Sequence, residues 1–113
     1  MSEAEAKTKL ELLVLSSEEP ALSSAQVNDL VAAARRPDAE DRVHGEDGWE
    51  ETWDLDAAAA EGWTRKAALA ANRFNFAEDG QRFDRAQTYA HCISQAERYA
   101  RRSMGSIPVG SSS

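Results

Sequence analysis

The sequence predicts a mainly α-helical fold: a small bundle of three to four helices, with one short β-hairpin between the last two long helices and an extended C-terminal tail. Two observations predict the helices. Apolar residues recur at helical spacing in several segments, and 21 of the 113 residues are alanine, the strongest helix former. A third observation predicts the hairpin, an Asp-Gly pair flanked by phenylalanines. The length suits one domain, expected over residues 9–104.

The chain should begin with a polar end and two helices. Residues 1–8 are polar and are expected to be a flexible N-terminus. The apolar run 9–15 is too short to classify by period, and a short helix is favoured over a strand. Ser23 then has Gln26 three positions on, which is the pattern of a capping box, and Pro37 should end this second helix. Its core-facing residues are expected to be Val27, Leu30, Val31 and Ala34.

A long acidic loop is expected at residues 38–53. Residues 38–61 carry ten acids and one base, whereas residues 62–113 carry four acids and eight bases, so the two parts have opposite net charge. Loops of this length are usually functional or partly disordered. Trp49 and Trp53 lie four positions apart and could hold the loop against the helices.

A third helix should begin near Asp54 or Asp56, because aspartate is a good N-cap, and continue through an alanine-rich segment. Glycine inside a helix costs about 1 kcal/mol relative to alanine. Gly62 therefore indicates close approach of another backbone at that point. A stripe of small residues for tight packing is expected at Ala59, Gly62, Ala67 and Ala70.

The hairpin is expected at residues 73–83, where Phe74 and Phe76 alternate with other residues and Asp79-Gly80 forms the turn. Asp84 should cap the last helix, which runs to about Ser103. The core stripe of that helix is expected to comprise Ala86, Tyr89, Ile93, Ala96, Ala100 and Met104. Residues 105–113 should form an extended tail whose apolar part suits addition to a partner's sheet, with a disordered end as the alternative.

No motif indicates catalysis, a cofactor or a metal ion. The turn shares only Asp79 and Gly80 with a calcium loop, and Arg82 stands where an oxygen ligand would be needed. His91 and Cys92 show no metal-ligand spacing, so a surface imidazole and a buried thiol are expected. The acids around His44 are expected to form a solvated face. Nucleophile elbows, phosphate loops and zinc signatures are missing from the sequence, which predicts a protein that is not an enzyme.

Composition indicates a subunit of an assembly. Leu, Ile, Val and Phe together number only 18 residues, so the core should be thin and should gain from burial against a partner. The net charge of −7 argues against a free-standing binder of duplex DNA. No apolar run approaches the roughly 20 residues that span a bilayer, so no membrane contact is expected.

Residues 54–101 resemble the head-completion, or adaptor, proteins of long-tailed bacteriophages, and residues 18–36 resemble the start of the same family. Together the resemblance covers roughly residues 10–104. The features that carry it, in order, are Ala58–Ala60 before Gly62–Trp63, then Lys66–Ala68, the Phe74-x-Phe76-x-x-Asp79-Gly80 turn, and Phe83, Arg85 and Gln87.

The resemblance implies a virion protein of the head-tail neck, assembled in the bacterial host cytoplasm. Such a protein binds the portal protein after packaging and forms a ring, expected to have twelve subunits, that extends the DNA channel and receives a stopper or the tail. DNA would pass through without sequence-specific binding. Subunit or portal interfaces are expected to involve Trp63, Phe76, Phe83, Arg98, Arg101, Arg102, Ile107, Pro108 and Val109.

The opposite charges of the two parts of the chain fit a head-to-tail contact between subunits. We therefore expect Arg98, Arg101 and Arg102 of one subunit to face the acidic loop of the next. Two other classes remain open. One is a small cytosolic helical interaction module that binds a single partner without a ring. The other is a different phage neck component such as a stopper, which would be richer in β-structure.

Overall fold

The computed structural model describes the backbone of residues 1–74 and 79–105 and the side chains of residues 1–72 and 86–103. The described chain holds four helices and one two-stranded antiparallel sheet. In chain order they are α1 (Glu3–Val14), α2 (Ser24–Ala33), β1 (Arg35–Arg36), β2 (Thr52–Trp53), α3 (Leu55–Phe74) and α4 (Asp79–Gly105). The predicted fold class, a mainly helical small bundle with one short hairpin, is confirmed.

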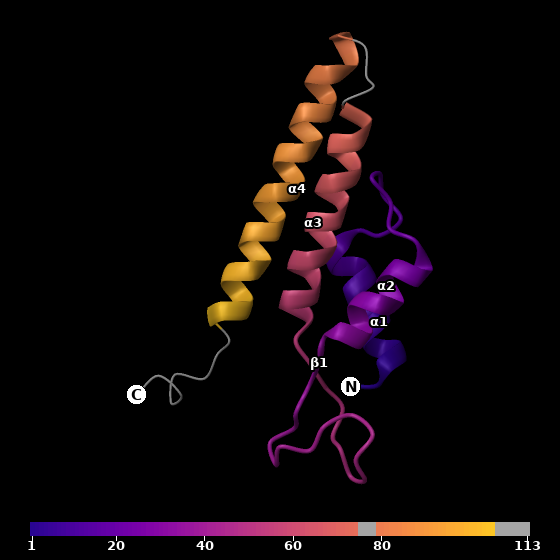
Figure 1. Ribbon diagram of the computed structural model, residues 1–113, viewed down its shortest axis with the longest axis vertical. Coiled ribbons are helices and arrows are strands. Elements are labelled where there is room, and N and C mark those ends of the chain that lie inside the picture. Colours follow the sequence, from indigo (N-terminus) through magenta and orange to yellow (C-terminus); the bar gives the residue numbers. More distant parts are fainter. Residues whose placement is uncertain (75–78, 106–113) are drawn as a thin grey trace.

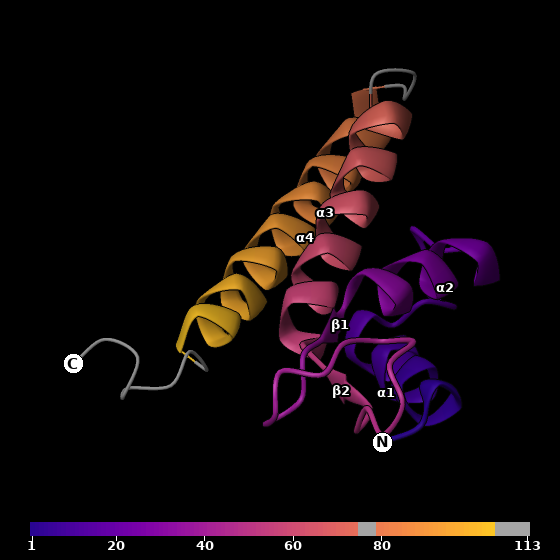
Figure 2. The same ribbon diagram turned by 60° about the horizontal axis from the view of Figure 1, so that its bottom comes forward.

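The helices form a long pair and a short pair. α3 and α4 run antiparallel and share the most extensive contact in the molecule (Figure 1). α1 and α2 pack against each other and against α3, on the side of α3 that faces away from α4 (Figure 2). They reach only the half of α3 nearest its N-terminus, so the far half of the α3–α4 pair extends beyond them as an arm (Figure 1).

α1 begins earlier than the sequence predicted. The backbone N–H of Glu5 donates to Oγ of Ser2 at 3.2 Å, and the N–H of Ser2 donates to Oε1 of Glu5 at 3.3 Å, which completes a capping box. The core-facing residues of α1 are Ala6, Leu10 and Val14, all fully buried. The prediction that residues 1–8 are a flexible end is therefore wrong, because the cap and the buried first turn hold this segment in place.

α2 confirms the predicted start of the second helix. The N–H of Gln26 donates to Oγ of Ser23 at 3.1 Å, and the N–H of Ser23 donates to Oε1 of Gln26 at 2.9 Å. Leu22 before the cap and Val27 after it are both buried, as a hydrophobic staple requires. The predicted core residues of this helix, Val27, Leu30, Val31 and Ala34, are all buried.

The hairpin predicted at residues 73–83 is wrong. α3 continues to Phe74 and α4 begins at Asp79, so Asp84 lies inside the last helix and does not cap it. An isolated two-stranded hairpin is marginal in water. Two long helices satisfy their own backbone groups and pack along each other, which outweighs the local turn preference of Asp-Gly.

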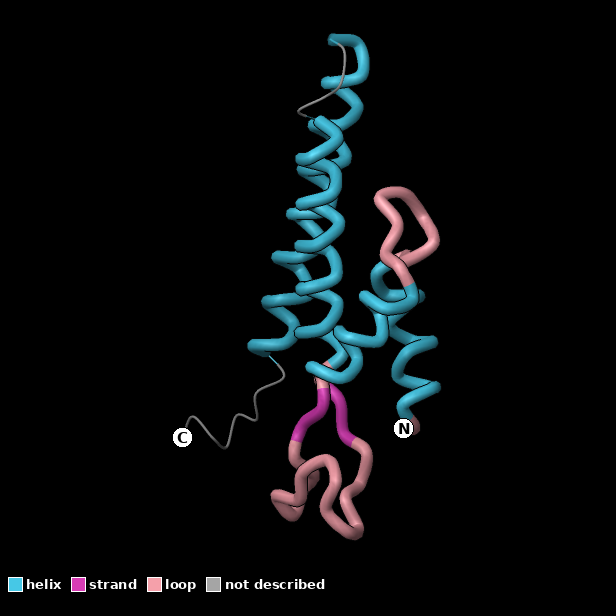
Figure 3. Tube along the Cα trace, turned by 45° about the vertical axis from the view of Figure 1, so that its right-hand side comes forward, coloured by secondary structure: helices cyan, strands magenta, loops and turns pink. Residues whose placement is uncertain are grey.

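The short hairpin lies between α2 and α3, where it closes the base of a loop formed by residues 37–51 (Figure 3). The strand register is Arg35↔Trp53 and Arg36↔Thr52. One further bond extends the ladder, from the N–H of Asp54 to the carbonyl of Ala34 at 2.8 Å. The sheet therefore holds the start of α3 against the end of α2.

Gly62 marks the closest packing between the long and the short pair of helices. A Cβ at Gly62 would lie 2.7 Å from Cγ1 of Val14 on α1 and 3.4 Å from Cδ1 of Leu30 on α2. The prediction that another backbone approaches here is wrong, because the nearest atoms belong to the buried side chains of Val14 and Leu30. The small-residue stripe around it is buried as predicted, at Ala59, Gly62, Ala67 and Ala70.

α4 turns a different face to the core from the one predicted. Its buried residues are Cys92, Ala96 and Tyr99. Tyr89, from the predicted stripe, is 42% exposed, and Ala86 and Ala100 are exposed as well. Both stripes have helical spacing and both include Ala96, so periodicity alone could not separate them. Of the predicted stripe, Ile93, Ala96 and Ala100 line an open groove between α3 and α4.

Candidate functional site

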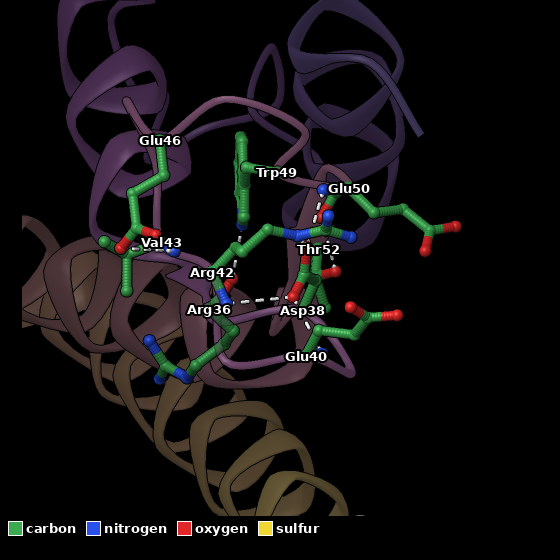
Figure 4. A network of polar contacts seen from close by, with 9 residues as sticks. All are labelled: Arg36, Asp38, Glu40, Arg42, Val43, Glu46, Trp49, Glu50 and Thr52. Atoms are coloured by element: carbon green, nitrogen blue, oxygen red, sulfur yellow. Dashed lines mark hydrogen bonds and ion pairs between the residues drawn. The ribbon is translucent and has the colours of Figure 1, made fainter.

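One carboxylate organises the loop at residues 37–51 (Figure 4). Oδ1 of Asp38 accepts hydrogen bonds from the N–H groups of Glu40, at 2.9 Å, and Arg42, at 3.0 Å. Oδ2 accepts from the N–H of Glu50 and from Nε of Arg42, both at 2.9 Å. The Asp38 side chain is buried, so four donors converge on a carboxylate shielded from water and fix the shape of the loop.

These donors also set the charge of Asp38. The Glu50 N–H contributes most, and with the Arg42 and Glu40 donors it holds the pKa of Asp38 well below its ordinary value, although burial opposes the shift. Asp38 is therefore ionised at neutral pH. Sequence reasoning missed this residue. The signal that could have found it is an aspartate directly after Pro37, because Asp at a loop start accepts the N–H two residues on.

Two tryptophans attach the loop to the rest of the chain. Nε1 of Trp49 donates to the carbonyl of Arg36 at 3.1 Å, and Nε1 of Trp53 donates to the carbonyl of Met1 at 2.9 Å. The two rings meet edge to face with centroids 5.9 Å apart, and His44 meets Trp49 in the same way at 5.2 Å. Their hydrogen bonds go to β1 and to Met1, and Trp53 also packs against the core that the helices form, as predicted.

The outer surface of the loop is acidic. Its exposed acids are Glu40, Asp41, Glu46, Asp47, Glu50 and Glu51. Arg42 is the base of this segment, and its guanidinium is bound to Asp38, so it does not neutralise the outer surface. Across the described residues, no three His, Cys, Asp or Glu side chains converge as a metal site would require. The arrangement suits contact with a basic surface.

An open cleft of about 950 Å³ separates the loop from the lower ends of α3 and α4. Trp53 lies in its wall, together with charges of both signs. Arg36 lies 3.8 Å from Asp54, and Arg102 lies 3.7 Å from Asp56. Oγ of Ser103 donates to Oδ2 of Asp54 at 2.8 Å. These contacts tie the C-terminal end of α4 to the start of α3.

The three arginines predicted as interface residues occupy two different environments. Arg98 and Arg101 are exposed, and Arg101 makes only a weak surface pair with Glu97 at 3.9 Å. Arg102 is committed within the chain, since it pairs with Asp56 and its guanidinium lies 5.3 Å from the Tyr99 ring centre. All three arginines are exposed, and Arg102 differs from the other two in pairing with Asp56 on α3.

Trp63 lies in the core and not on the surface. Its Nε1 donates to the carbonyl of Leu13 at 3.1 Å, and its ring meets His91 edge to face at 5.5 Å. The Trp63 side chain is buried by other residues of the same chain, so it does not form the exposed interface that the sequence suggested. Phe76, Ile107, Pro108 and Val109 lie outside the described residues, as does the side chain of Phe83.

Lys66 is a buried cation, only 1% exposed, that sequence reasoning also missed. Its Nζ donates to the carbonyls of Val14 and Leu15, both at 2.7 Å, at the C-terminal end of α1 where a cation suits the helix dipole. Burial lowers the pKa of Lys66 and raises the pKa of the Cys92 thiol. The prediction of a buried Cys92 and an exposed His91 is confirmed.

Comparison with known proteins assigns no family: no family model matches the chain, and no curated protein or solved structure is significantly similar to it. None of the helices within residues 1–74 and 79–105 combines the length and the apolarity needed to cross a bilayer.

Proposed function

We propose that this chain is an adaptor protein of a phage head-to-tail connector. In this role it binds the portal protein after DNA packaging and forms a ring that extends the DNA channel and joins head to tail. The ordered motifs in residues 54–101 support the proposal through their resemblance to that family. The structural observation that carries it is the separation of a rigid acidic loop from the exposed arginines of α4.

The rigidity of the loop favours a repeated contact. Because Asp38 holds residues 37–51 in one shape, each copy presents the same acids without ordering a flexible segment on binding. Arg98 and Arg101 offer the opposite charge as exposed residues of α4. Copies that meet through unlike surfaces make a heterologous contact, which closes into a ring when the rotation allows.

The core also favours a role in an assembly. Of the buried residues, seven are alanines, and one of the largest buried side chains is the charged Lys66. Over its far half, the described backbone of the α3–α4 pair extends beyond α1 and α2 (Figure 1). A subunit built this way gains stability when neighbours cover it.

The test is to mix the purified chain with the portal protein of the same phage and to view the complexes by negative-stain electron microscopy. We expect a ring of chains on each portal. The variant Arg98→Glu/Arg101→Glu should lose the ring, while the charge-conserving Arg98→Lys/Arg101→Lys should keep it. Arg102 is left unchanged because it binds Asp56 within the chain.

A charge-reversed variant of the loop tests whether the loop is the surface that the arginines contact. Glu46→Lys/Asp47→Lys on the loop should weaken the ring alone and restore it in mixtures with the arginine-reversed chain. Unaltered rings from the arginine-reversed chain would rule out this contact. A one-to-one complex without a ring would instead favour the small helical interaction module.

A further inference from the structure

The α3–α4 pair carries an open apolar groove of about 550 Å³ that no described segment covers. Two rows of small or apolar residues line it with the same spacing. They are Ala57, Ala60 and Thr64 on α3, and Ile93, Ala96 and Ala100 on α4. Glu61 and Glu97 lie at its edges. A groove with short side chains along both walls can admit larger side chains from a partner.

α1 carries the complementary feature, two exposed leucines. Leu12 is 71% exposed, more than any other large hydrophobic residue among those described, and Leu15 is 40% exposed. Leu12 lies two positions after the buried Leu10, so it points almost directly away from the core. α1 and α4 lie on opposite sides of α3 (Figures 1 and 2).

The backbone conformation at Leu15 is unfavourable for a leucine. It caps α1 in the left-handed conformation, with φ 49° and ψ 56°. Helices commonly end in this conformation at glycine, which adopts it without steric cost, whereas a leucine there is strained. Packing within the chain leaves 40% of the side chain exposed. The exposed part of this side chain is available to a partner, and burial there would offset part of the backbone strain.

We propose that Leu12 and Leu15 of one copy dock into the α3–α4 groove of a neighbouring copy. The leucines and the groove lie on opposite sides of α3, so the contact is heterologous and every copy can both give and receive it. The proposal rests on the ring of the proposed function for its geometry. The groove borders the arginines of the proposed function, because Glu97 at its edge pairs with Arg101, but its apolar lining contains neither Arg98 nor Arg101.

Charge favours the same pairing. Lys9 lies one turn before Leu12 on the exposed face of α1 and has no ion pair among the described residues. Glu61 and Glu97, beside the groove, make only exposed pairs with Arg65 at 3.5 Å and Arg101 at 3.9 Å. Exposed pairs of this kind contribute little, so either acid can turn to Lys9 of the neighbour.

The test compares self-association of the full chain, measured by sedimentation velocity, with its thermal stability. Leu12→Ser should weaken association about tenfold or more, as loss of an anchoring side chain does, and leave Tm unchanged. Leu15→Gly should raise Tm, because it relieves the left-handed leucine, and still weaken association. Tyr89→Ser, an exposed apolar residue of α4 outside the groove lining, is the matched control and should change neither.

Cross-linking tests the direction of the contact. A Leu12→Cys copy mixed with an Ala100→Cys copy should form an intermolecular disulfide, while neither variant alone should do so. Dimers of Leu12→Cys with itself would show a symmetric contact and overturn the proposal, as would unchanged association of Leu12→Ser. Rings on the portal that are insensitive to Leu12→Ser would leave the adaptor function standing without this contact. If the chain never bound the portal but its association still depended on Leu12, the leucine contact would stand and the adaptor function would be ruled out.

Discussion

Oδ2 of Asp38 accepts a hydrogen bond from the backbone N–H of Glu50 at 2.9 Å, and this bond joins the two ends of the acidic loop. Without it, the loop would be a long polar segment attached mainly through its tryptophans. With it, donors from both ends of the loop at residues 37–51 converge on the Asp38 carboxylate (Figure 4). The acids on the outside are then held at fixed positions relative to the helices.

Asp38→Asn should loosen this loop, because an amide lacks the charge that strengthens all four bonds and cannot accept as well from the Arg42 guanidinium. We expect a lower Tm and faster proteolysis within residues 39–49, with the helical circular dichroism retained. Asp41→Asn, at an exposed acid of the same loop, is the control and should leave both unchanged. Equal proteolysis of the two variants would contradict the role given to Asp38.

The same carboxylate should give the loop a defined acid limit. The pKa of Asp38 is lowered in the folded chain, so its contribution to stability is fully present above the ordinary aspartate pKa of about 4. The contribution is lost progressively as the pH falls from there toward the folded pKa. The difference in stability between the native chain and Asp38→Asn, measured by urea unfolding, should be constant from pH 7 to 5 and shrink below about pH 4. A constant difference down to pH 3 would refute this.

Gly62→Ala should destabilise the fold even though alanine is the better helix former. The new Cβ would lie 2.7 Å from Cγ1 of Val14, a stiff and fully buried side chain. Overpacking of this kind costs about 1–3 kcal/mol, which exceeds the helix-propensity gain of about 1 kcal/mol. In a Val14→Ala background the same change should be neutral or stabilising. Urea unfolding measures the effect. An equal loss of unfolding free energy in the native and Val14→Ala backgrounds would show that the contact with Val14 is not the cause.

Gly80→Ala should behave in the opposite way. Gly80 lies in the first turn of α4, so alanine should leave Tm unchanged or raise it slightly. In the turn of a hairpin, where glycine adopts positive φ, the same change would lower Tm. Thermal unfolding of this single variant therefore separates the helix from the hairpin that the local sequence suggested.

Lys66→Met should lower stability at neutral pH, because the carbonyls of Val14 and Leu15 lose a buried donor at the end of α1. Leaving a buried acceptor unpaired costs about 1–3 kcal/mol. The pKa of Lys66 is lowered on folding, so the unfolded chain binds more protons as the pH approaches 10.5. The native chain should thus gain stability relative to Lys66→Met as the pH rises toward 10.5. A gap that narrows over this range would contradict the assignment, and Arg65→Met, at a half-buried cation of the same helix, is the control.

Short-range signals in the sequence were sufficient for α2 and for the start of α3. Ser23 with Gln26 fixed one helix start, and an aspartate fixed the other, through the bond from the Ala57 N–H to Oδ1 of Asp54 at 3.0 Å. The burial of Cys92 likewise followed from its residue type. Caps and free cysteines can be read locally because their partners lie within a few residues or are simply apolar neighbours.

Features that depend on distant parts of the chain could not be read in this way. The Asp79-Gly80 pair signals a turn, but the pairing of two long helices overrides it. Lys66 stands in register with the small-residue stripe of α3, a place that should have marked it as buried, yet its partners are 51 and 52 residues away. The face that α4 buries is likewise decided by α3, not by the period of α4 itself.

The bond from Lys66 to Val14 also bears on the order in which the chain can fold. α1 has 12 residues, and isolated helices of that length are marginal in water. The ammonium group that caps it is 52 residues further along the chain, so during synthesis α1 leaves the ribosome long before its cap does. α1 should therefore be among the last helices to become stable, and its two exposed leucines should acquire their final position only once α3 is in place.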